Sequence, residues 1–367
     1  MLVTAARCIA VVVAWSLSHA AAAQTGKLTW QSLDTAPSGA GCHAVSFQDP
    51  HALVMDGNGN LIIANEKGDA ALQEITTGGE IHTLLNRNSP ALHGGKYFAL
   101  SLAVDADNSV VLAVDGRKTI ERLRTDGSLV HIAGIAGKAQ SVDGPAQSAT
   151  FKAPTAVAVD GHGTIYVADS RVIRKIDPSG VVTTLAGNET SKVDYADGKG
   201  KAAAFNAPVG MAVGAAGVVL VAEGEEREGE EGHGSSFGAI RKLDHEAVVT
   251  TLAGALDADG ALLDGKGKRA LFAHIWGMAQ DSGGNLYVTQ ENTIAIAVRK
   301  VEPDGQTTTV LSSEAGSGNR DGSDPRFMEL TGIAPDKAGN LYVVDTGANT
   351  LRKIDSKRFV TTLSECK

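Results

Sequence analysis

A single phrase recurs along this chain and limits what it can fold into. Its clearest version runs from Thr150 to Gly187, and five diverged versions lie before and after it. They can be aligned on the frame Phe-x-x-Pro-x-Gly/Ala-x-x-x-Asp, although the second copy has lost the Phe and the Pro; the starting positions are Phe47, Lys96, Phe151, Phe205, Phe272 and Phe327. Repeats of this length are typical of propellers and solenoids, in which each repeat is one supersecondary unit.

Each repeat contains four short apolar segments, rich in Val, Ile and Thr and bounded by Gly, Asn or Asp. In the last repeat these include NLYVVD from Asn340, LRKID from Leu351 and VTTLS from Val360. Such segments predict short strands joined by tight turns. Four strands in each of six copies predict an all-β fold, a six-bladed β-propeller. A β-solenoid is the weaker alternative, because solenoid coils are usually shorter.

The predicted domain organisation has three parts. Arg7, an apolar stretch from Ile9 to Leu17 and the small residues Ala21-Ala22-Ala23 mark residues 1–23 as a cleaved signal peptide. Residues 24–46 form an N-terminal segment in which LTWQSL, from Leu28, is a candidate outer strand. Residues 47–367 form the propeller. We therefore expect a periplasmic or secreted protein, a monomer without a membrane anchor, since the apolar stretch is too short to span a bilayer.

Charge and cysteine content add two expectations. The formal net charge of −9 argues against a nucleic-acid partner, whose surface calls for a basic patch. Once Cys8 is removed with the signal peptide, Cys42 and Cys366 flank the first and last blades. In an oxidising compartment such a pair favours a disulfide that clasps the ring, with two unpaired thiols as the alternative.

The repeated motifs also carry a resemblance. The run DGxGxxAxF-x-x-P-x-G, followed by GNLYVAD, IRKID and VTTLAG, resembles the NHL-repeat family of six-bladed propellers. Its nearest copies run from Asp197 to Gly210 and from Asp264 to Gly277. The resemblance implies the fold over the mature chain. It does not imply one function, because relatives include enzymes, sensor ectodomains and interaction modules.

A site for one ligand should break the repeat, and one set of candidates does so at the mouth of the channel. The residue that opens each innermost strand forms a ring: His51, Leu100, Thr155, Val209, Trp276 and Thr331. In the fifth blade His274-Ile275-Trp276 replaces the usual Ala-Pro-small residue. Trp is common at binding hot spots, which makes His51, His274 and Trp276 candidate ligand-binding residues. Core packing of the Trp and structural roles for the two His are the alternatives.

A second ring follows the second strands and is rich in side-chain oxygen: Asn65, Asp115, Asp169, Glu223, Gln290 and Asp345. These groups could hold a hard cation such as Ca²⁺. For Asp169 and Asp345, which fit the repeat, we expect turn-capping instead. Glu223 breaks the repeat and, with Gln290, is a candidate ligand-binding residue. The recurring Arg174, Arg241, Arg299 and Arg352 are expected to be structural, with stems packed between blades and heads paired.

One insertion stands out in the fourth blade, EGEEREGEEGHGSSFG from Glu223 to Gly238. Its glutamates and glycines cannot bury apolar surface, so we expect a mobile loop, either simply solvated or acting as a lid or cation tether.

Three functions remain open, and one of them is a sensor or assembly scaffold at the cell envelope, which would require a partner chain. The first of the other two is a binding or interaction module whose channel mouth recognises a protein, peptide or glycan of the cell envelope. The second is a metal-dependent hydrolase or lyase, resembling the lactonase and peptidyl-hydroxyglycine lyase propellers, with Ca²⁺ or Zn²⁺ as the metal. Against the second, Gln48-Asp49-Pro50 stands where the lactonase relatives carry Glu-Gly-Pro. No catalytic motif decides whether the chain is an enzyme.

Overall fold

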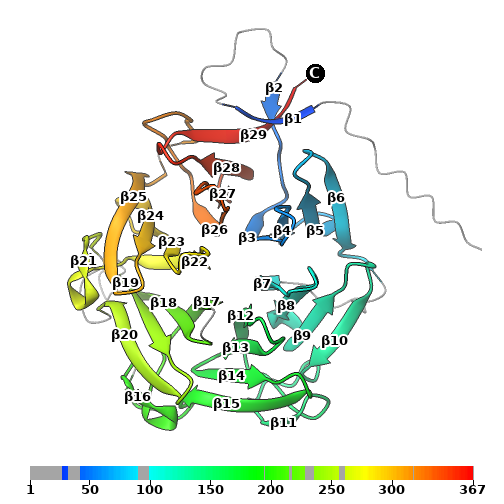
Figure 1. Ribbon diagram of the computed structural model, residues 1–367, viewed down its shortest axis with the longest axis vertical. Coiled ribbons are helices and arrows are strands. Elements are labelled where there is room, and N and C mark those ends of the chain that lie inside the picture. Colours follow the sequence, from blue (N-terminus) through cyan, green and yellow to red (C-terminus); the bar gives the residue numbers. More distant parts are fainter. Residues whose placement is uncertain are drawn as a thin grey trace, which may run out of the picture.

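The computed structural model shows six antiparallel β-sheets arranged as blades around a central axis (Figure 1). It describes residues 27–31, 42–89, 99–193, 195–214, 217–227, 235–255, 261–316 and 318–366. The expected six-bladed β-propeller is confirmed. The predicted signal peptide, residues 1–23, lies outside the described residues. Among the residues described, no helix is long and apolar enough to cross a membrane.

Every blade is built from four strands that follow one another in the chain. The first two blades comprise β3 (Pro50–Met55), β4 (Leu61–Asn65), β5 (Ala70–Ile75) and β6 (Ile81–Asn86), then β7 (Ala99–Val104), β8 (Val110–Val114), β9 (Thr119–Leu123) and β10 (Leu129–Ala133). The third and fourth comprise β12 (Pro154–Val159), β13 (Ile165–Asp169), β14 (Val172–Ile176) and β15 (Val181–Gly187), then β17 (Pro208–Val213), β18 (Val219–Arg227), β19 (Ser235–Leu243) and β20 (Val248–Gly254). The fifth and sixth comprise β22 (His274–Gln280), β23 (Leu286–Glu291), β24 (Ala295–Val301) and β25 (Gln306–Glu314), then β26 (Leu330–Pro335), β27 (Leu341–Asp345), β28 (Thr350–Ile354) and β29 (Val360–Cys366).

The connections between the later blades run along the outer edge of the next blade. The two-residue strands β11 (Gly144–Pro145), β16 (Gly198–Lys199) and β21 (Gly265–Lys266) pair with the outermost strands β15, β20 and β25. Each connection thereby brings its Asp-Gly motif against the outer half of a blade. This explains why the motif recurs in the sequence.

A buried arginine cluster repeats in blades three to six. Arg174, Arg241, Arg299 and Arg352 each lie over a buried phenylalanine, with guanidinium carbon to ring-centre distances of 4.8, 5.4, 5.2 and 5.0 Å. All four arginines are fully buried. In the third blade Arg174 donates to Asp143 of the preceding connection at 2.8 Å and to Asp169 at 3.1 Å. The structural role expected for these arginines is confirmed.

Adjacent inner strands approach closely where the repeat carries its glycine. A Cβ at Gly332 would lie 2.7 Å from the backbone nitrogen of Leu53 in the first blade. A Cβ at Gly277 would overlap the carbonyl oxygen of Thr331 in the sixth blade. These glycines allow the inner strands of neighbouring blades to pack side by side around the axis.

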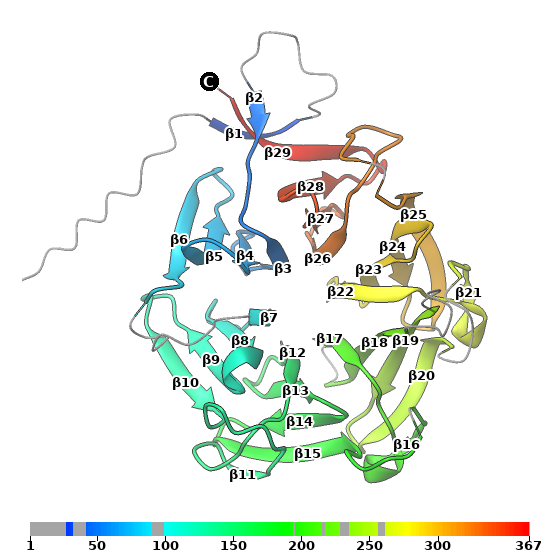
Figure 2. The same ribbon diagram turned by 180° about the vertical axis from the view of Figure 1, so that it is seen from behind.

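The N-terminal segment closes the ring. β1 (Lys27–Gln31) pairs along the outer edge of β29, from Lys27 opposite Cys366 to Gln31 opposite Thr362. β2 (Cys42–Ala44) pairs with the end of the same strand. Figure 2 shows both strands meeting β29 at the top of the ring. The outer strand expected from Leu28 is therefore present, and residues of segment 24–46 form part of the sixth blade.

The insertion in the fourth blade differs from the expected mobile loop. β18 and β19 continue as a paired hairpin out to Arg227 opposite Ser235. The hairpin packs against the fifth blade because two of its residues lack side chains. A Cβ at Gly224 would lie 2.9 Å from the backbone nitrogen of Ile275, and one at Gly238 would lie 2.8 Å from Cβ of Phe272. The expectation of a loop is thus wrong for residues 223–227 and 235–238. Residues 228–234 lie outside the described residues.

Candidate functional site at the channel mouth

The inner strands enclose a cavity of about 660 Å³ along the axis of the propeller. Residues from both ends of the inner strands line it, from His51 at the start of β3 to Met55 at its end. A cavity of this volume is typical of small-ligand sites, which measure about 300–1,000 Å³. The cavity therefore is the candidate site, and we call its end at the start of the inner strands the mouth.

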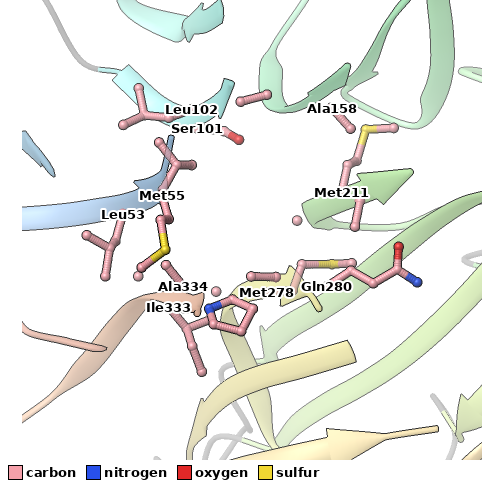
Figure 3. Close-up of a pocket in the computed structure, with 18 of the residues that line it drawn as sticks. Leu53, Met55, Ser101, Leu102, Ala158, Met211, Met278, Gln280, Ile333 and Ala334 are labelled. Atoms are coloured by element: carbon pink, nitrogen blue, oxygen red, sulfur yellow. The ribbon is translucent and has the colours of Figure 1, made fainter. Parts of the chain in front are cut away.

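Methionines supply much of the cavity's apolar wall. Met55, Met211 and Met278 come from blades one, four and five, and Figure 3 shows them around the open centre of the channel. Leu53, Leu102 and Ile333 also line it. Methionine side chains are flexible and polarisable, which suits them to apolar ligands of irregular shape. The cavity can thus accept an apolar group.

Trp276 and His51 mark the mouth as the sequence predicts. Both line the cavity, and Trp276 leaves 39% of its surface exposed. His274 does not line the cavity but packs edge-on against Trp276, with ring centres 4.3 Å apart and planes at 67°. His274 therefore holds the indole in place. Core packing, the alternative for Trp276, does not agree with its exposure.

A compact charged group surrounds His51 in the first blade. Nε2 of His51 lies 3.4 Å from Oδ1 of Asp49 and 3.7 Å from Oε2 of Glu66. Nζ of Lys67 lies 2.8 Å from the other oxygen of Asp49, and this hydrogen bond lowers the pKa of the Asp49 carboxyl. Two backbone hydrogen bonds fix the group. The N–H of Glu66 donates to the carbonyl of Asp49 at 2.8 Å, and the N–H of Lys67 donates to the carbonyl of Gln48 at 3.0 Å.

Sequence reasoning missed Asp49 and Glu66 as site residues. The signal was present, because FQDPH in the first blade replaces the Phe-x-Ala-Pro-small pattern of FKAPT and FNAPV. Two departures from the repeat, Asp49 and His51, flank one proline. A comparison of blades at that position would have placed the two residues at a single point of the mouth.

The second ring does not form an open circle of oxygens. Asp169 and Asp345 are fully buried and accept from backbone N–H groups: those of Lys152 and Ala153, at 2.7 and 2.8 Å, in the first case. They also bind Arg174 and Arg352. These N–H groups belong to the segment before the first strand of each blade and not to the turn that follows the Asp, so both residues are structural but bind across the blade instead of capping their own turn as expected.

Glu223 takes the same structural place in the fourth blade. It is 1% exposed, accepts from the backbone N–H of Asn206 at 2.7 Å and binds Arg241. Burial raises the pKa of the Glu223 carboxyl, while Arg241 and the Asn206 N–H act in the opposite direction. Glu223 does not line the cavity. Its departure from the repeat is a change from Asp to Glu within a buried ion pair.

Gln290 is the real exception in this ring. It is fully buried opposite Ile275, and among the described residues neither atom of its amide has a hydrogen-bond partner. Arg299 consequently pairs with one carboxylate, that of Asp264, at 2.9 Å. Burial lowers the pKa of the Arg299 guanidinium, although the carboxylate of Asp264 opposes this effect. Ligand binding by Gln290 stays a prediction.

The fold and the repeated motifs define an NHL-like six-bladed β-propeller. The model of the Teneurin NHL domain family matches residues 137–196. Teneurin-1 of Gallus gallus is 42% identical over 45 residues, a stretch that makes up 12% of this chain and 2% of Teneurin-1. The similarity therefore concerns part of the propeller and a small part of that relative.

Solved structures similar to this chain are propellers of low sequence identity. Virginiamycin B lyase from Staphylococcus aureus is 14% identical, with a TM-score of 0.53 over 92% of this chain and 88% of the other. A gluconolactonase from Xanthomonas campestris is 15% identical, with a TM-score of 0.52 over 93% of this chain and 96% of the other. At these identities the likeness concerns the fold alone.

Proposed function

We propose that this protein is a binding module that holds an apolar or aromatic side chain of a peptide or protein in its axial channel. The observation that carries the proposal is the exposed indole of Trp276 at the mouth of the cavity. A large exposed aromatic next to an apolar pocket is typical of a binding hot spot.

The channel wall combines apolar side chains, which suit an apolar anchor, with the polar side chains of Ser101, Gln280, Asp281 and Ser282. Met55, Met211 and Met278 offer polarisable surface but no hydrogen-bond donor to hydroxyl groups. At the mouth, Asp49 and Glu66 offer carboxylates, which favour a cationic group next to the anchor. The preferred ligand is therefore a peptide segment with an apolar side chain flanked by Lys or Arg.

We further propose that the mature chain acts outside the cytoplasm, after cleavage before Gln24, as a monomer facing partners of the cell envelope. The support is the pattern of residues 1–23 in the sequence. N-terminal sequencing of the exported protein tests this: a protein that keeps residues 1–23 and stays in the cytoplasm would contradict it.

The second function, a metal-dependent hydrolase or lyase, is less well supported. The likeness to lyase and lactonase propellers concerns the fold, and Glu223, one candidate for its chemistry, is engaged in a buried ion pair.

The binding proposal is tested with a phage-displayed library of random short peptides, selected in the presence of a chelator. Peptides selected on the wild type should bind the Trp276→Ala variant about 30-fold more weakly, the loss typical of a hot-spot aromatic. Phe359→Ala is the matched control, because Phe359 is 38% exposed but does not line the cavity.

A second pair of variants tests the channel itself. Met55→Lys places a charge in the cavity wall and should abolish binding, whereas Met328→Lys changes an exposed methionine that does not line the cavity. Peptides that bind all four variants like the wild type would overturn the proposal.

A further inference from the structure

We infer that Asp49, His51 and Glu66 form a binding site for one divalent transition-metal ion of the zinc class. Their ligand atoms, one from each residue, lie within 4.8 Å of one another. Among the residues that the structure describes, this is the one group of three or more His, Cys, Asp or Glu side chains with that spacing.

Two of the three ligand distances are close to the geometry that such an ion requires, and the third, between the two carboxylates, is within 4.8 Å. With metal–ligand bonds of about 2.0–2.1 Å, two ligand atoms of a tetrahedral site lie roughly 3.3–3.4 Å apart. Nε2 of His51 is already 3.4 Å from Oδ1 of Asp49. Oε2 of Glu66, 3.7 Å from the same nitrogen, needs to move by a few tenths of an ångström.

The backbone around the three residues is fixed independently of any ion. The hydrogen bonds between residues 48–49 and 66–67 hold Asp49 and Glu66 together, and the N–H of Asp49 donates to Oδ1 of Asn349 in the sixth blade at 2.9 Å. The carbonyl of Pro50 accepts from Thr346 at 2.6 Å. A site held in this way loses little conformational entropy when it binds an ion.

The charges favour a cation. Asp49 and Glu66 bring two carboxylates together, and Lys67, with its ammonium on Asp49, balances one of them. Lys67 contacts Oδ2 and leaves Oδ1 directed to His51. The imidazole decides the class of ion, because nitrogen ligands suit zinc and its neighbours whereas Ca²⁺ prefers oxygen.

The site borders the channel, since His51 lines the cavity. Three protein ligands leave the fourth position of a tetrahedral ion for water or for a ligand in the channel. The inference does not rest on the proposed peptide-binding function, but the ion would occupy the carboxylates of Asp49 and Glu66 that the cationic group of a peptide would otherwise face.

The experiment is isothermal titration calorimetry: the mature chain is stripped of metal with a chelator, the chelator is removed, and Zn²⁺ is titrated in. One ion should bind per chain, and more tightly than Ca²⁺. His51→Ala and Glu66→Gln should each weaken Zn²⁺ binding at least about 100-fold, since loss of an outer-shell partner alone costs about 10–100-fold. Thermal melting of each variant without metal checks that it folds.

His82→Ala is the matched control. His82 lies 3.4 Å from Glu80 in the same blade, but this exposed pair has no third ligand in the described chain. Its removal should leave Zn²⁺ binding unchanged, and so should Cys42→Ser, which tests for a thiol site. Absence of 1:1 binding, tighter binding of Ca²⁺, or Zn²⁺ binding that survives in His51→Ala would overturn the inference. In each of these cases, peptide binding measured in the presence of a chelator still tests the proposed binding function separately.

Discussion

Cys42 lies directly opposite Cys366 in the antiparallel pairing of β2 with β29. Three residues further on, the N–H of Val45 donates to the carbonyl of Leu363 at 2.9 Å, which marks a hydrogen-bonded pair. Because hydrogen-bonded and non-hydrogen-bonded pairs alternate, the two cysteines form a non-hydrogen-bonded pair, with Cα atoms about 4.5 Å apart. Disulfides span Cα distances of about 4.4–6.8 Å. The backbone register thus allows the disulfide that the sequence predicts.

We predict that the mature protein contains this disulfide. Denatured, unreduced protein should show no free thiol, and reduction should destabilise the fold by about 4–5 kcal/mol, as expected for so long a loop. That corresponds to a fall of about 6 °C in the melting temperature. The Cys42→Ser variant should melt at the lower temperature with or without reductant. Two reactive thiols in the unreduced wild type would contradict the prediction.

Blades four and five differ at one buried position, which is Glu223 in blade four and Gln290 in blade five. Exchanging the two residue types tests what the buried carboxylate contributes. Glu223→Gln leaves Arg241 with one carboxylate, that of Asp197, as Arg299 has with Asp264. We expect it to cost about 3 kcal/mol, since a buried pair loses one partner. Gln290→Glu supplies the carboxylate that Arg299 lacks and should stabilise by about 1–2 kcal/mol.

Chemical denaturation of both variants measures these changes, and peptide binding provides the second readout. Because Glu223 does not line the cavity, Glu223→Gln should retain wild-type peptide affinity. A variant with unchanged stability but weakened peptide binding would return Glu223 to the binding site.

The glycine at the inner edge of blade five should tolerate no side chain. In Gly277→Ala the new methyl group would overlap the Thr331 carbonyl, a backbone atom that cannot rotate away. We expect a loss of about 2–3 kcal/mol from overpacking. Gly161→Ala is the control, because nothing lies within 4 Å of the position that its methyl group would take. Equal stability of the two variants in urea would show that the inner strands can separate at no cost.

Three tyrosines should titrate abnormally at high pH. Tyr166, Tyr287 and Tyr342 each donate to an aspartate in the preceding turn at 3.3 Å. Burial, with Asp336 as a further cause, raises the pKa of Tyr342 to about 12. The folded state therefore holds this proton more tightly than the unfolded state. The contribution of Tyr342 to stability is complete below pH 10 and declines as the pH rises toward 12.

An absorbance titration of the phenolate measures this pKa. Tyr342→Phe should remove the component near pH 12, and Asp336→Asn should move it toward the ordinary value. If the folded wild type shows all of its tyrosines titrating together near pH 10, the assignment is wrong.

Much of this fold follows from the sequence because it repeats. A residue that recurs in four blades, such as the Arg of IRKID, indicates a packing contact that each of these blades needs. In the structure each of these arginines lies between a Phe ring and an Asp carboxylate. Trp276 was also predictable, since it replaces a small residue at a known position of the ring.

The charged group at His51 was harder to predict. Asp49 and Glu66 are separated in sequence and meet because the turn after β4 folds back onto the start of β3. The prediction that Glu223 binds a ligand rested on its change from Asp, which is visible in the sequence. Its contact with Arg241, which gives it a structural role, is not visible there. The residues that follow Glu223 form a paired hairpin instead of the expected loop, because Gly224 and Gly238 lie close to the backbone of the fifth blade. Composition does not reveal these contacts.

The pairing of β1 with β29 also sets an order of events during synthesis. β1 and β2 cannot pair until the chain is nearly complete, since their partner residues, 362–366, emerge last. Until then the nascent propeller is an open arc with two unpaired edges, the kind of edge that invites aggregation.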